Sequence, residues 1–444
     1  MELLILLLVI IFIIVATVRY KMHPVLSLVI AAIISGFLLG LKPETIMKTI
    51  GEGFGKTLSG IGLVIAFGTI IGVFLEKTGS TKVLANTVLK WVGLKKSPLA
   101  LNLAGFIISI PVFCDSGFII LSSLNKALNK KTGIPILIFA VALATGLYAA
   151  HVFVPPTPGP LAAAAILDAD LGSVLLLGLV VAIPVSIAGY FWAMYIGKSL
   201  KTAPLTKAVD KSQEVKNEQA QYNVKPFQAF LPLFVPMLLI ALKSIADYPT
   251  KPLGEGFLFD VITFFGNPII ALLIGVFLSF LLAKSAARDL RNEWILNALK
   301  QAGLIILITG AGGAFGAILR TIDINEMLNL QSTSGFGGLL ICFLIAATLK
   351  SAQGSSTVAI ITTAAIIAPL LETFGLDEGM DTALSVLAIG AGAMTVSHIN
   401  DSYFWVVSQF SNMDVKTALK GHTVATLFQG LTGIGVVLLL RLLL

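Results

Sequence analysis

The sequence Ile110-Pro-Val-Phe-Cys-Asp-Ser-Gly117 interrupts an apolar run over residues 99–125. It places a proline, a carboxylate and a Ser-Gly pair where an apolar helix would otherwise continue. A second apolar run, 336–373, is interrupted by Lys350-Ser-Ala-Gln-Gly-Ser-Ser356. We interpret both runs as re-entrant hairpins, which enter a membrane and return to the same side. Irregular backbone at that depth is tolerated only where it is buried in protein or faces water.

The composition indicates a polytopic all-α membrane protein. The chain has 444 residues, of which 57% are hydrophobic and 12% charged, about half the charged fraction of a soluble domain. The mean hydropathy is +0.96. Basic cytoplasmic loops explain the net charge of +7, so no nucleic-acid partner is expected. The two cysteines lack the spacing of metal ligands or of a disulfide framework, and neither a metal nor a cofactor is expected.

A membrane-spanning helix needs about 20 apolar residues, and ten segments meet this condition. The first is interpreted as a retained helix and not a signal peptide, because no basic region precedes it. The predicted spans are 2–18, 24–41, 58–75, 134–151, 172–196, 227–246, 267–283, 301–320, 381–397 and 421–443.

The distribution of charge supports the two hairpins. With the N-terminus outside, the segments predicted to lie inside carry 22 Lys and Arg residues against 7 Asp and Glu, in agreement with the positive-inside rule. This excess arises only if both broken runs are re-entrant, since a spanning 99–125 would move the three following lysines outside. The charged residues left at membrane depth are Asp115, Lys350 and Asp401.

The two halves of the chain resemble each other. Gly68–Leu75 aligns with Gly312–Leu319, a broken hairpin follows in each half, and a helix then ends at His151 or His398. The charges orient the matching helices in opposite directions. We therefore expect two inverted-topology repeats, each with a re-entrant hairpin and a broken transmembrane helix, an arrangement typical of secondary transporters.

The predicted organisation is N-terminal transmembrane helices (1–57), a first repeat (58–196), a basic cytoplasmic linker (197–226), connecting transmembrane helices (227–300), a second repeat (301–412) and a C-terminal transmembrane helix (413–444).

The hairpin tips carry candidate binding groups. Asp115 is a carboxylate at membrane depth and hence a functional candidate, although it could also only cap a helix. Ser355–Thr357 stand where a helix is expected to start, and the free amides of a helix start suit an anion. Ordinary capping is the alternative there. Lys350 either adds a positive charge to this site or extends to the membrane interface.

The stretch His151-Val-Phe-Val-Pro-Pro-Thr-Pro-Gly-Pro160 follows an apolar helix. Four prolines in six positions cannot continue a helix, so we expect extended backbone whose amides and carbonyls are free for a ligand or ion. The alternatives are a surface loop and, for His151, a satisfied core histidine.

The matching stretch is Val396-Ser-His-Ile-Asn-Asp-Ser402. Asn400 and Ser402 can bond hydroxyl groups, while His398 and Asp401 can exchange protons. An ordinary turn at the end of a helix is the alternative, and His422, further along the chain, is assigned no role.

Other functional classes find little support. Gly51-Glu-Gly-Phe-Gly-Lys-Thr57 resembles a phosphate-binding loop, but Ile50 stands where that motif needs glycine. An ATP-driven pump is therefore not expected. The hydrolase motifs HExxH and GxSxG are absent from the sequence, and an enzyme is not expected either.

The chain resembles the GntP family of gluconate permeases, part of the ion transporter superfamily, nearly end to end. The resemblance is strongest at His151–Pro160, at Gln353-Gly-Ser-Ser-Thr-Val-Ala359 and at Ser397-His-Ile-Asn-Asp-Ser-Tyr-Phe-Trp405. It implies a multi-pass protein of the plasma (inner) membrane that imports gluconate or related sugar acids with protons. It also implies an elevator-type movement on a homodimeric scaffold. Two positions depart from the family pattern: the hairpin glutamate is Asp115, and the second motif histidine is Thr157.

We therefore predict a proton symporter for gluconate or a related small hydroxylated monocarboxylate. The alternatives are a sodium-coupled carboxylate transporter, a D-serine or glycerate permease of the same family and, less favoured, an anion channel. Predicted substrate-binding residues are Ser116, Gly117, Thr157, Gln353, Gly354, Ser355, Ser356, Thr357, Asn400 and Ser402. Predicted proton-coupling residues are Asp115, His151, His398 and Asp401.

Overall fold

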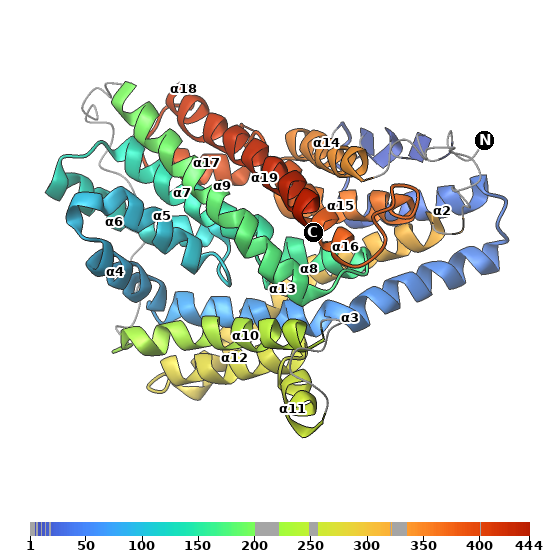
Figure 1. The fold of residues 1–444 in the computed structure, drawn as a ribbon, viewed down its shortest axis with the longest axis horizontal. Coiled ribbons are helices and arrows are strands. Elements are labelled where there is room, and N and C mark those ends of the chain that lie inside the picture. Colours follow the sequence, from blue (N-terminus) through green and yellow to red (C-terminus); the bar gives the residue numbers. More distant parts are fainter. Residues whose placement is uncertain are drawn as a thin grey trace.

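The regular elements of the structure, a computed structural model, are helices throughout the part of the chain that it describes (Figure 1). The prediction of an all-α membrane protein is confirmed. Asn400, most of the predicted linker 197–226 and much of the span 2–18 lie outside the described residues. The described residues are 5, 8, 9, 11–13, 15, 16, 19–199, 222–247, 256–319, 321, 335–399 and 401–444.

Seven described segments are long and apolar enough to cross a membrane. They are α3 (Pro43–Lys77), the α7–α8 segment (Ile136–Ile166), α9 (Leu171–Ser199), α10 (Pro226–Ala246), α13 (Arg288–Leu319), α14 (Phe336–Gln353) and the segment Val415–Leu443, which ends in α19 (Val424–Leu443). An eighth span is formed if α11 (Phe257–Phe265) and α12 (Pro268–Leu282), which meet at 64°, count as one. Other described helices are α2 (Pro24–Leu38), α4 (Ser80–Val92), η1 (Leu94–Lys96) and η2 (Ala368–Leu370). The segment Val415–Leu443 begins with α18 (Val415–Ala418) and the π-helical segment η3 (Leu419–Thr423).

Two helices extend well beyond the predicted spans. The span 58–75 lies within α3, and residues 301–319 of the span 301–320 lie within α13, so the predicted domain boundaries after residues 57 and 300 fall inside continuous helices. Helical hydrogen bonds are local, so a helix can continue past an apolar stretch into polar sequence. The end of an apolar run therefore does not mark the end of the helix. The two helices pack closely, and a Cβ atom on Gly53 would lie 2.5 Å from the Cβ atom of Ala317.

Both predicted hairpins contain a break in the helix. The first consists of α5 (Ser97–Ile108) and α6 (Cys114–Thr132), and the second of α14 and α15 (Ser356–Ile367). The 12 residues of α5 rise about 18 Å, short of a hydrocarbon core of about 30 Å. Because α14 alone is long enough to span, the length of this arm does not require a re-entrant path, and the re-entrant course of 336–373 stays a prediction.

Two helices are interrupted as expected. α7 (Ile136–Phe153) is followed by α8 (Pro158–Ile166), and α16 (Met380–Met394) by α17 (Ser402–Phe410). The prediction of extended backbone through all four prolines is wrong for the last two, because Pro158 begins α8 and Pro160 lies within that helix. The fixed φ of proline suits the first position of a helix, where its missing N–H is not needed.

The packing around the breaks is alike in both halves. α5 packs on α7 and α14 packs on α16, while α6 contacts α17 and α15 contacts α8. The close approach requires glycine, since a Cβ atom on Gly146 would lie 2.0 Å from the Asn102 carbonyl oxygen, and one on Gly392 would lie 2.2 Å from that of Phe343. All of α7 is buried, so the breaks lie around a central helix. The opposite topology of the halves stays a prediction.

A layer of helices lies beside this assembly. α12 packs on both α10 and α3, and Figure 1 shows α10 and α12 running along one side of α3. The other side of the molecule in this view carries α9 and α19, which pack on each other.

Candidate functional site

A buried ion pair joins the second hairpin to the second broken helix. Lys350 lies in the last turn of α14, and Asp401 is the residue preceding α17. Lys350 Nζ lies 2.5 Å from Asp401 Oδ2, and the two side chains are 1% and 4% exposed. Two charges at such burial are stable only when they are paired and further hydrogen-bonded. The charged residues left over at membrane depth thus include a matched pair.

The Asp401 carboxylate has donors on both oxygens. Oδ2 also accepts from the Ser397 hydroxyl, and Oδ1 accepts from the Tyr403 backbone amide at 3.0 Å, which caps α17. These contacts satisfy the ionised form of Asp401.

The Lys350 ammonium lies at the tip of the second hairpin. It donates to the Gly354 carbonyl at 3.3 Å and stands 5.9 Å from the centre of the Tyr148 ring. Gly354 ends α14 with a φ of +76°, and Ser355 caps α15 by accepting from the Val358 amide at 3.4 Å. The cation is therefore beside the start of α15, where the first amides have no partner within the helix.

Two tyrosines connect the central helix to these elements. The Tyr148 hydroxyl donates to Ser356 Oγ at 3.2 Å, and the Tyr403 hydroxyl donates to the Ala144 carbonyl at 2.9 Å. Their ring centroids are 5.2 Å apart. Neither tyrosine was predicted from the sequence, because an aromatic residue next to apolar sequence looks like ordinary core. The only sequence feature that pointed to a role for these tyrosines was the hydroxyl group, which needs a hydrogen-bond partner when it is buried.

His422 is a third residue that the sequence analysis missed. It is fully buried, and its Nε2 lies 3.2 Å from the Ser397 hydroxyl that bonds Asp401. His422 belongs to the π-helical segment η3, and π-helical turns are frequent at functional sites. Its separation in sequence from the hairpin motifs gave no sign of this placement.

Asp115 lies in the first turn of α6, at the tip of the first hairpin. Its Oδ1 atom is buried and, within the described part of the chain, has no hydrogen-bond partner. Asp401 and Lys350 both act on it electrostatically, and α6 contacts α17, the helix that Asp401 precedes. Of the neighbouring candidates, Ser116 is partly buried, while Gly117 packs so closely that a Cβ atom would lie 2.7 Å from Leu147 Cδ2.

The first broken helix faces a polar cavity of about 230 Å³. His151 and Thr157 both line it, and the Thr157 hydroxyl donates to the Val154 carbonyl at 2.6 Å. His151 Nδ1 is buried and, among the residues described, has no hydrogen-bond partner. The lining of the cavity consists of Gly68, Thr69, Pro111, Val112, Phe113, His151, Pro156, Thr157 and Pro158.

The remaining candidates lie around the second tip. The His398 Nε2 atom lies 3.1 Å from the Ser351 carbonyl oxygen, so this ring contacts α14. Gln353 is the last residue of α14, and Thr357 lies partly buried in the first turn of α15. Ser402 is exposed at the start of α17. The structure thus brings together Asp401 and the Gly354–Ser356 tip, and leaves the Ser402 side chain at the surface.

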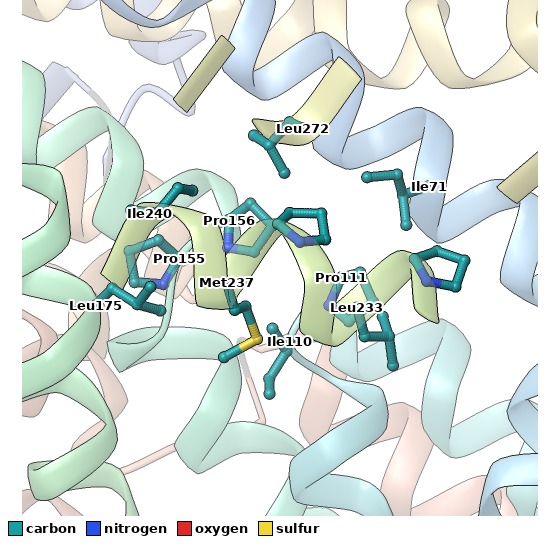
Figure 2. Close-up of a pocket in the computed structure, with 12 residues that line it drawn as sticks. Ile71, Ile110, Pro111, Pro155, Pro156, Leu175, Leu233, Met237, Ile240 and Leu272 are labelled. Carbon is teal, nitrogen blue, oxygen red and sulfur yellow. The ribbon is translucent and has the colours of Figure 1, made fainter. Parts of the chain in front are cut away.

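An apolar cavity of about 350 Å³ separates the first tip and first broken helix from α10. Figure 2 shows Pro111, Pro155 and Pro156 beside Met237 and Ile240 of α10. Prolines at the two breaks thus meet α10 through an apolar surface.

The chain is similar to known permeases along its whole length. The profile described as GntP family permease matches residues 1–443. A gluconate permease of Pseudomonas aeruginosa is 34% identical over 435 residues, covering 96% of this chain and 94% of the relative. A high-affinity gluconate transporter of Escherichia coli is 32% identical over 432 residues, covering 96% of each chain. A D-serine transporter of Escherichia coli is 31% identical over 425 residues, covering 94% of this chain and 93% of the relative.

Two solved transporters share the fold. The YdaH transporter of Alcanivorax borkumensis has a TM-score of 0.67 at 16% identity, over 94% of this chain and 98% of that one. MtrF of Neisseria gonorrhoeae has a TM-score of 0.62 at 16% identity, over 89% of this chain and 83% of that one.

Proposed function

The chain belongs to the GntP permease family, and we propose that it imports gluconate or a related small hydroxylated monocarboxylate by proton symport. It is a multi-pass protein of the plasma membrane. The observation that carries the proposal is the buried Lys350–Asp401 pair at a hairpin tip, with Asp115 within its electrostatic reach. Charges at membrane depth mark ion and proton pathways. The proposed activity is transport without covalent change of the substrate.

The proposed carboxylate site is the start of α15. Free amides and the positive end of the helix dipole favour an anion there, and the Lys350 ammonium lies beside them. The proposed hydroxyl-binding groups are Thr157, Asn400 and Ser402, of which Thr157 lines the polar cavity. An unmatched buried polar group costs about 1–3 kcal/mol, so the buried Thr157 would favour hydroxylated acids over apolar ones.

The proposed proton carriers are the carboxyl groups of Asp115 and Asp401, assisted by His151 or His398. Support comes from the buried Asp115 oxygen without a partner and from the electrostatic coupling of the two carboxyls. Each of the two carboxyls is a candidate for the coupled proton. The proposed assembly, on the family resemblance, is a homodimer.

Uptake by proteoliposomes tests this function. With an inward pH gradient, labelled gluconate should accumulate, unlabelled gluconate should compete for uptake, and replacement of sodium by choline should have no effect. Loss of uptake in choline would instead identify a sodium-coupled transporter. Because a D-serine transporter is among the relatives, D-serine and glycerate belong in the competition panel. Saturation of the uptake rate distinguishes a transporter from an anion channel.

A further inference from the structure

We propose that Lys350 binds the substrate carboxylate directly and that Asp401 occupies Lys350 while the substrate is absent. The inference rests on the proposed function and adds that Lys350 exchanges one carboxylate partner for another during transport. In the empty site the ammonium is paired with Asp401. In the loaded site it pairs with the substrate, and Asp401 accepts a proton.

The position of Lys350 supports this role. Among the lysines and arginines that the structure describes, Lys350 alone is classed as buried. Its ammonium bonds both Asp401 of one element and the Gly354 carbonyl of the hairpin tip. A carboxylate bound at the first amides of α15 would therefore meet this ammonium. A small shift of the flexible lysine side chain is enough to exchange one carboxylate for the other.

The charges explain why a proton must follow. The Lys350–Asp401 pair is neutral, and a bound monocarboxylate would add one negative charge to a buried site. Such a charge is costly without compensation. Protonation of Asp401, once the ammonium has left it, restores the original charge. One proton per monocarboxylate is thus expected, and the proton enters only with the anion.

Several titratable groups face the Asp401 carboxyl and belong to the same electrostatic environment. Ser397 connects it to His422 through one hydroxyl, which offers a path for the proton. The groups contributed by the surrounding elements are Cys114 and Asp115 of α6, Tyr148 and His151 of α7, Lys350 of α14, Tyr403 of α17 and His422 of η3.

The test compares gluconate binding and uptake for Lys350→Met, Asp401→Asn and the double variant. Asp401→Asn removes the competing charge and should bind gluconate several-fold more tightly, while losing acceleration by a pH gradient. Lys350→Met should bind at least about 10-fold more weakly, since it removes the charge-assisted hydrogen bond to the substrate carboxylate. The double variant should bind gluconate as weakly as Lys350→Met, although neither member of the buried pair is then left as an unpaired charge.

The matched control is the exposed pair Lys56–Asp168, in which Lys56 Nζ lies 3.2 Å from Asp168 Oδ2. The double variant Lys56→Met/Asp168→Asn should bind and take up gluconate like the wild type.

A purely structural ion pair gives different results. Both single variants would then lose binding through misfolding, and the double variant would regain it. Recovery of binding in the double variant, or weaker binding in a folded Asp401→Asn protein, overturns the inference. Thermal unfolding in detergent shows which variants are folded. A wild-type protein that accumulates no hydroxy acid overturns the proposed function instead, so the two failures are distinct.

Discussion

The two carboxyl groups at the site differ in their hydrogen bonding. Asp401 has three donors from a lysine, a serine and a backbone amide, whereas Asp115 Oδ1 is buried without a partner among the described residues. An ionised oxygen in that position is costly, and binding a proton removes the cost. Asp401, in contrast, needs its partner lysine to leave before it can accept a proton.

Asp115→Asn is expected to separate exchange from accumulation. The amide preserves size but can neither bind a proton nor pass one on to Asp401, so uptake driven by a pH gradient should fall by at least about 10-fold, the scale of about 1.4 kcal/mol. Exchange of labelled for unlabelled gluconate across the membrane should persist at a reduced rate. Asp115→Glu, which restores the residue of the family pattern, is the control and should accumulate substrate. Gradient-driven accumulation by Asp115→Asn would contradict the assignment.

Ser397→Ala is expected to destabilise the protein by about 1.5–3 kcal/mol. It removes a hydroxyl that donates to a buried carboxylate and lies 3.2 Å from His422 Nε2. The change is measured as the midpoint of thermal unfolding in detergent. Ser59→Ala removes an exposed hydroxyl that bonds only its own helix and should leave the midpoint unchanged. Equal midpoints for the two variants would show that the Ser397 contact contributes nothing.

Sequence patterns identified the charged members of the site but not their partners. The charged members are Asp115, Lys350 and Asp401. They were identified because they could be assigned to neither the inside nor the outside of the membrane. The pairing of Lys350 with Asp401 spans 51 positions, and no local pattern contains it. Tyr148 and His422 lie within helices that pack as core, so their hydroxyl and imidazole roles depend on tertiary contacts alone.

At the scale of elements, prolines, glycines and clusters of polar residues predicted the breaks well, whereas the apolar runs predicted the helix lengths poorly. Both hairpins and both broken helices are interrupted close to the predicted positions. The first break ends just before Cys114, so that Asp115 lies in the first helical turn, where the helix dipole favours an acidic side chain. The lengths of α3 and α13 were underestimated because their exposed ends are polar helix.

Gly146→Ala tests the seating of the first hairpin on α7. Because the new Cβ atom would lie 2.0 Å from the Asn102 carbonyl oxygen, α5 must shift, at a cost of about 1–3 kcal/mol. We expect a lower unfolding midpoint and slower uptake together. Gly435→Ala, at a helical position with open space around it, should be neutral or stabilising by up to about 1 kcal/mol. Equal effects of the two substitutions would show that the hairpin is not held by this contact.

At the scale of the whole molecule, composition predicted a polytopic helical protein, but not which parts move together. The elements that carry the breaks pack on one another around α7, whereas α10, α12 and α3 form a neighbouring layer. The first tip and first broken helix face α10 across the apolar cavity. Apolar contacts are not directional, so such a surface can slide without breaking hydrogen bonds. We propose that the site-bearing elements move along it in an elevator-type transition.

A crosslink across the cavity tests this movement. Ile110 of the first tip and Met237 of α10 both line the cavity, and cysteines at these positions can be joined by a short bifunctional thiol reagent. The native Cys114 and Cys342, which are buried and free, are first replaced by alanine. If the tip moves against α10, the crosslinked protein should bind gluconate but lose nearly all uptake, and a reductively cleavable reagent should allow recovery. The control joins α10 to α12 within the neighbouring layer, at Leu233 and Leu272, which also line the cavity. That crosslink should leave uptake intact, because both residues belong to the layer that stays fixed. Uptake that survives the first crosslink, or is lost equally with the second, contradicts a sliding movement at this surface.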